Sequence, residues 1–108
     1  MKLKETRLKL LNAQAMLLDA LWRKHGGLRK CAKLCGVPEY QLNAWRARGG
    51  VPWKYVLQVS VALKVPRTVL NFQKIFGLVD EGDWVTMVKA CKLDLASEKK
   101  ILKMKVPR

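Results

Sequence analysis

The sequence predicts an all-α fold. Half of its 108 residues are hydrophobic, which is enough for one packed core and too many for a disordered chain. The apolar residues recur at three- and four-residue spacing, as on a helix face, and residues 1–77 lack the alternating pattern of strands. Glycine and proline divide the chain into segments of helical length. We therefore expect one domain built from several helices.

Residues 4–24 form the first expected helix. No proline interrupts them, and Gly26 and Gly27 end the segment because glycine accepts the left-handed conformation that follows a helix. The apolar side chains of this segment form a wide stripe, so we expect the helix to be buried over much of its surface. Its apolar side chains are Leu8, Leu11, Ala15, Leu18 and Trp22, widened by Leu10, Leu17 and Leu21.

Two short helices separated by a tight turn are predicted over residues 28–35 and 39–47. Gly36 supplies the positive φ of the turn, and Pro38 suits the first turn of the second helix, where a missing N–H has no partner. Ala32 is small where the second helix crosses the first. The apolar anchors of the second helix are Val37, Leu42 and Trp45. This pattern is typical of a helix-turn-helix motif, whose second helix fits the major groove of DNA.

Residues 52–64 and 66–77 predict a fourth and a fifth helix, because each segment begins near a proline and carries an apolar stripe. Five helices complete a unit that we assign to residues 1–77. The remainder, residues 78–108, is a C-terminal extension.

The extension gives a weaker signal. Residues 84–88 fit the start of a helix capped by Asp83, but their valine and threonine content also fits a strand. Residues 97–103 fit one or two helical turns, or a frayed end. We expect the extension to be helical.

The charge points to a polyanionic partner. The net charge is +14 and the pI is about 10.2, with most of the excess in residues 1–77. Nucleic acid is the first expectation and an anionic membrane surface the second. No uncharged stretch exceeds nine residues, so we expect no transmembrane helix, and no apolar signal core follows the N-terminus. These features favour the cytoplasm.

No catalytic, cofactor or metal site emerges from the sequence. Three cysteines do not make a disulfide framework and favour a reducing compartment. Cys31 and Cys35 lie four residues apart, but only His25 and Cys91 remain as further ligands and their spacing is wrong, so we expect core cysteines. There is no glycine-rich phosphate loop and no nucleophile elbow. We therefore do not expect an enzyme.

Residues 28–47 resemble the helix-turn-helix domains of the lambda-repressor and Cro class. Trp45, the Val51-Pro52 pair and the apolar residues beyond them extend the likeness to small phage and prophage regulators, the Cro-like and YdaS-like proteins and, more loosely, CII-type activators. The resemblance covers residues 8–70. It implies a five-helix, lambda-repressor-like domain and a sequence-specific transcriptional regulator that binds double-stranded operator DNA as a homodimer. Pro38 departs from the pattern, because the family usually has Ser or Thr there.

The resemblance also implies which residues read DNA. Asn43 could pair with adenine, Glu39 could accept from cytosine, and Tyr40 could contact a thymine methyl or a phosphate. The groove-facing set that the family pattern gives is Glu39, Tyr40, Asn43, Ala44 and Ala47. Basic residues near this helix are phosphate candidates: Arg29, Lys30, Lys33, Arg46, Arg48, Lys54 and Arg67.

The extension is the natural place for dimer contacts, because the five helices already complete the DNA-binding unit. Its apolar candidates are Trp84, Val85, Val88 and Leu95. Trp53 is another tryptophan that could serve a subunit interface.

Two other functions stay open. The chain could be a protein-interaction module that engages a host protein, such as polymerase, through its basic surface or its tail. It could also coat nucleic acid without sequence preference or bind RNA, although Glu39 on the groove face argues against this.

Overall fold

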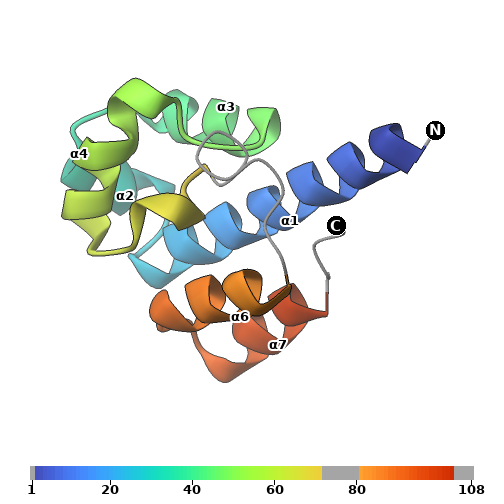
Figure 1. Ribbon diagram of the computed structural model, residues 1–108. Coiled ribbons are helices and arrows are strands. Elements are labelled where there is room, and N and C mark those ends of the chain that lie inside the picture. The colour runs from blue at the N-terminus through green and yellow to red at the C-terminus, as the bar shows by residue number, and fades with distance from the viewer. Residues whose placement is uncertain (1, 72–80, 104–108) are drawn as a thin grey trace.

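The computed structural model describes residues 2–71 and 81–103, and the side chains of residues 12–71 and 84–103. All secondary structure in these ranges is helical, which confirms the all-α prediction there. The elements, shown in Figure 1, are α1 (Lys2–Lys24), α2 (Leu28–Cys35), α3 (Glu39–Arg48), α4 (Trp53–Leu63), the 3₁₀ turn η1 (Arg67–Val69), α6 (Glu81–Ala90) and α7 (Leu95–Leu102).

The long helix α1 is the centre of the arrangement. It packs against α2 and α3 on one side and against α7 on the other (Figure 1). The helix α2 also packs against α3 and α4, and η1 lies between α4 and α6. As a result, α3 and α4 reach the outside of the molecule on the side away from α6 and α7.

One hydrophobic core joins all these helices. Leu18 and Trp22 of α1, expected in the core, are buried, and Leu17 and Leu21 are buried beside them. Leu8, Leu10 and Leu11 are expected on the same apolar stripe, but their side chains lie outside the described range. Buried residues of the extension belong to the same cluster: Trp84, Met87, Val88, Cys91, Leu93 and Ile101. The extension therefore builds onto the core of the first helices instead of forming its own.

The helix boundaries follow glycine and proline closely. The expected bounds of α2 are confirmed, and α3 extends one residue beyond the prediction, to Arg48. Gly36 and Gly49 follow these helices with φ of 71° and 88°, in the left-handed region that disfavours a Cβ. Pro38 and Pro52 each occupy the position just before a helix, one residue earlier than a first-turn proline.

The fifth helix expected over residues 66–77 is wrong in its first part. Only the 3₁₀ turn at Arg67–Val69 forms, and Asn71 is irregular; residues 72–77 lie outside the described range. The cause is a pair of long-range hydrogen bonds. The N–H of Val51 donates to the carbonyl of Leu70 at 2.8 Å, and the Asn71 amide donates to the carbonyl of Val51 at 2.9 Å. These bonds turn the chain across the α3–α4 loop.

The extension is helical where it is described, as expected, and the strand alternative is wrong. The helix α6 begins at Glu81, so Asp83 lies inside its first turn and is not its cap, as the sequence suggested. The last helix, α7, begins at Leu95, two residues before the predicted start, and Asp94 is at its N-cap.

Candidate nucleic-acid interface

The turn between α2 and α3 holds the two helices in a fixed relation. Gly36, in its left-handed conformation, lets the N–H of Val37 donate to the carbonyl of Ala32 at 3.0 Å. Ala32 is buried, as expected for the small residue at the crossing. The amide of Gln58 in α4 donates to the carbonyl of Cys35, so α4 supports the end of α2.

The inner side of α3 is anchored by the residues that the sequence singled out. Leu42 is fully buried and Trp45 is 1% exposed, while Val37 packs against the core from the turn. The ring of Trp45 meets that of Tyr55 in α4 with centroids 5.2 Å apart, in a tilted arrangement that suits aromatic pairs. Because these anchors fix the inner side of α3, they also determine which residues the helix presents on its outer side.

The outer side of α3 carries the predicted groove-facing residues. Glu39, Tyr40, Asn43 and Ala47 are exposed, and Ala44 is half-buried at their margin. Tyr40 is 69% exposed, although it is a large aromatic side chain. The helix thus presents a carboxylate, a phenol and an amide on one face, with small residues between them. We call this set of five residues the α3 face.

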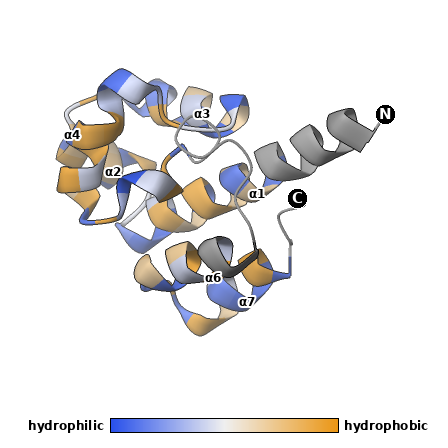
Figure 2. Ribbon diagram, in the orientation of Figure 1, coloured by the Kyte–Doolittle hydropathy of each residue, from blue (hydrophilic) through white to orange (hydrophobic). Residues whose placement is uncertain are grey.

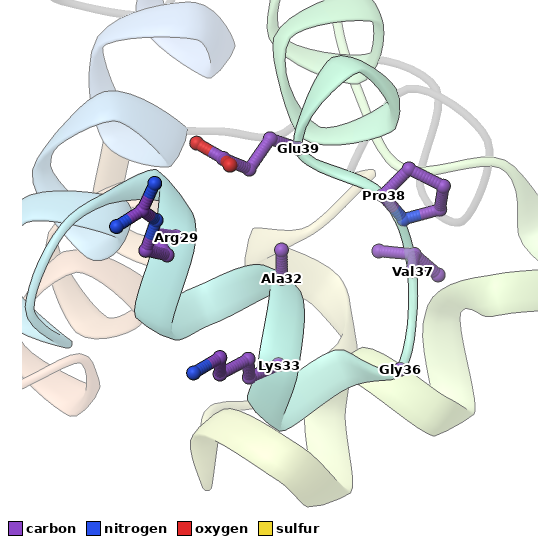
Figure 3. A pocket seen from close by; sticks show the side chains of 7 residues that line it. All are labelled: Arg29, Ala32, Lys33, Gly36, Val37, Pro38 and Glu39. Carbon is purple, nitrogen blue, oxygen red and sulfur yellow. The ribbon is translucent and has the colours of Figure 1, made fainter.

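An open hollow lies beside the start of α3. Arg29 and Lys33 of α2 line one side, and Glu39 enters from α3, with its carboxylate directed toward the side of Arg29 (Figure 3). Pro38 occupies the N-cap of α3 and makes no side-chain cap hydrogen bond, because proline has no polar side-chain atom. The hollow therefore brings two cations of α2 to the same side as the one carboxylate of α3.

Six of the seven predicted phosphate-binding residues are exposed: Arg29, Lys30, Lys33, Arg48, Lys54 and Arg67. Lys54 also lies over the ring of Tyr55, 5.2 Å from its centroid. Arg46 is the exception. Its guanidinium forms an ion pair with Asp19 of α1 at 3.0 Å, and the side chains are 42% and 39% exposed. Arg46 is therefore not a free cation, and its position fastens α3 to α1.

The residues expected at a dimer contact fall into two groups. Trp84 is 1% exposed and Val88 fully buried, so both fill the core of their own chain. This corrects the expectation that they meet a second copy: an apolar pattern in the sequence does not distinguish an interface from a core. Val85 is half-buried, and Leu95 is 66% exposed at the start of α7.

Sequence reasoning missed the polar contacts that position these helices. The amide of Gln14, fully buried in α1, donates to the carbonyl of Val69 at 2.6 Å. The ammonium of Lys24 donates to the carbonyl of Cys91 at 2.5 Å and ties α1 to the end of α6. No local pattern marks these pairs, whose members are 55 and 67 residues apart.

Cys31 and Cys35 are core residues, as expected, and Cys91 is buried as well. All three are buried free thiols, and Cys31 donates to the carbonyl of Trp22. Burial raises the pKa of Cys31 to about 11 and that of Cys91 to about 12, which suppresses the thiolate form that binds metals. No group of three potential ligands occurs among the described residues.

Comparison of the chain with protein-family models, curated proteins and solved structures returned no match. In the part of the chain that the structure describes, no helix has the length and apolarity needed to cross a bilayer.

Proposed function

We propose that this protein is a sequence-specific DNA-binding transcriptional regulator of the phage or mobile-element type. The carrying observation is the α3 face, defined above, on a helix whose opposite side is locked into the core by Leu42 and Trp45. A single α-helix fits the major groove, where amide and carboxylate side chains distinguish base pairs. Asn43 and Glu39 supply those two groups here.

The surrounding charge supports the same proposal. Arg29 and Lys33 border α3 near its start, and Arg48 is exposed at its end. Cations on both flanks of a recognition helix suit the phosphates that line a groove, and such contacts position a protein without specifying sequence. Glu39 among these cations argues for base reading over indiscriminate binding, because a carboxylate is repelled by phosphate.

A single module of this size buries little DNA surface. We therefore propose a homodimer on two half-sites about one helical turn apart, acting in the bacterial cytoplasm or nucleoid.

Selection of binders from a randomised duplex library, followed by salt titration of the winner, tests the proposal. We expect a palindromic consensus and an affinity that falls as salt rises. Asn43→Ala should cost about 1–3 kcal/mol and relax one base position. Asn12→Ala is the matched control, because Asn12 is an exposed asparagine of α1 and is not part of the α3 face.

A second pair of variants separates positioning from reading. Lys33→Ala should weaken binding to all duplexes alike and reduce the salt slope by about 1, whereas Lys99→Ala on α7 should change neither. If no sequence is enriched and every duplex binds with the same salt dependence, the chain coats DNA generically. If no duplex binds at all, DNA reading is rejected, and RNA or a protein is the target to test next.

A further inference from the structure

The outer side of α4 carries three large apolar side chains in a row. Trp53, Leu57 and Val61 are 56%, 62% and 69% exposed. They are spaced four residues apart, and side chains at this spacing lie next to one another along a helix. We call these three residues the α4 stripe. In Figure 2, α4 is coloured as hydrophobic over much of its length at the outer edge of the molecule.

The α4 stripe has no role in the core of the chain. The opposite side of α4 already fills that core with Val56, Val59 and Leu63, all nearly or fully buried. A helix that is apolar on both sides is normally covered on both sides. Among the side chains that the structure describes, the other exposed large apolar residues, Leu34, Tyr40 and Leu95, are each on a different helix. Single exposed residues need no partner, whereas a continuous apolar patch marks a contact surface.

The charge distribution favours a second copy as the occupant. Residues 55–63 hold no charged side chain, in a chain of net charge +14, and Lys54 is the one charged residue within the span of the stripe. An acidic partner would be drawn to the cations around α3, and two copies of the chain repel each other wherever those cations meet. The α4 stripe is where two copies can touch with the least repulsion, because apolar surface meets apolar surface.

We propose that two copies of this chain associate through their α4 stripes. This inference rests on the proposed function, because that function supplies the paired half-sites that a dimer would occupy. We place the two-fold axis beside Leu57, the middle of the three residues, and perpendicular to the helices. The two α4 helices are then antiparallel, and Trp53 of each copy lies against Val61 of the other. Lys54 then lies opposite Ser60, whereas a parallel pair would set Lys54 against itself.

The arrangement leaves α3 free for DNA. The buried side of α4 packs against α2 and η1, so the stripe is directed away from them, and no residue of the α3 face takes part. Three side chains per copy cover less than the ~1,200–2,000 Å² of a standard interface, so we expect a weak dimer with a Kd on the order of micromolar. Paired half-sites would strengthen it, since a ligand that binds only the dimer shifts the equilibrium.

Tryptophan fluorescence reports directly on this surface. Trp22, Trp45 and Trp84 are at most 2% exposed, so Trp53 alone among the four is accessible to acrylamide. We expect the quenchable fraction to fall as protein concentration rises, in parallel with the mass found by sedimentation equilibrium. Trp53→Phe should remove the quenchable fraction. A Trp53 that stays accessible while a dimer forms overturns the proposal.

Neutral substitutions test the contact without changing the net charge. Leu57→Gln should weaken the dimer by about tenfold or more, because the change occurs on both copies, and Val61→Gln should act in the same direction. Leu95→Gln is the matched control, with an exposed leucine on α7. Circular dichroism should show all three variants folded. Weakening by Leu95→Gln alone would move the interface to the extension and overturn the proposal, as would a wild-type chain that stays monomeric.

Salt separates this inference from the proposed function. Because salt screens the repulsion between two cationic copies, the dimer should tighten as salt rises, while DNA binding weakens. The dimer is measured without DNA. A dimer that Leu57→Gln disrupts, together with no duplex selected, would leave the interface standing and reject DNA reading. A monomer that selects a duplex would reject the interface alone.

Discussion

Arg46 of α3 and Asp19 of α1 form an ion pair, with Nη1 and Oδ1 3.0 Å apart, that bridges the proposed recognition helix and the longest helix of the fold. Asp19 also contacts Arg23, one turn further along α1, at 3.2 Å. One carboxylate therefore serves two guanidinium groups. The ion pair holds α3 from the margin of the α3 face, because Arg46 follows Asn43 by three residues, while the buried anchors Leu42 and Trp45 hold the inner side.

The coupling between these residues is measurable by a double-mutant cycle. We expect Asp19→Asn and Arg46→Gln each to lower the free energy of unfolding, with a coupling energy of about 0.5–1 kcal/mol because both side chains are partly exposed. Urea denaturation of the four proteins gives this energy. Arg23→Gln serves as the comparison, since it removes only the pair within α1. A coupling energy near zero would show that the ion pair does not hold α3.

Gly36 gives a second prediction, on the turn between α2 and α3. Gly36→Ala should destabilise the fold by about 1–2 kcal/mol, because φ is 71° and an L side chain is strained there. The nearest atom to an added Cβ is the Gln58 amide nitrogen at 3.6 Å, an ordinary contact, so the loss isolates backbone strain. Chemical denaturation should give Gly36→Asn a free energy of unfolding between those of the wild type and Gly36→Ala, since asparagine tolerates this conformation. Equal stability of wild type and Gly36→Ala would contradict the geometry.

Local signals predicted the part of the fold that local chemistry determines. The bounds of α2 and the positive φ of Gly36 follow from the preference of glycine for the end of a helix, and the burial of Leu42 follows from helical spacing. The exposure of Asn43 was predictable in the same way, because it lies on the face opposite the anchors.

Contacts between distant residues account for what the sequence could not predict. Residues 67–71 form no α-helix, because the N–H of Val51 donates to the carbonyl of Leu70. Arg46 is paired because the fold brings Asp19 next to it. Neither pairing is visible as a repeating pattern in the sequence. The interface prediction failed for Trp84 because its apolar pattern fits a core and a subunit contact equally well. The α4 stripe became visible only once the buried side of α4 was known.

His25 gives a prediction on pH. Partial burial, and then the charge of Lys24, lower the pKa of this imidazole below 6.5, and its Nε2 atom is buried with no hydrogen-bond partner in the described part of the chain. As pH falls below about 6.5, the unfolded chain therefore takes up a proton that the folded chain resists. The stability that the folded chain has at neutral pH, where His25 is uncharged, is therefore lost as the pH falls.

The thermal midpoint should accordingly be lower at about pH 5.5 than at about pH 7.5, and His25→Gln should reduce this difference because glutamine does not titrate. Carboxylates contribute little in this window, since their ordinary pKa values lie near 4, and the hydrogen bond from Ser97 lowers the pKa of Asp94 still further. Differential scanning calorimetry at matched ionic strength makes the comparison. A pH dependence that persists unchanged in His25→Gln would assign the effect to another group.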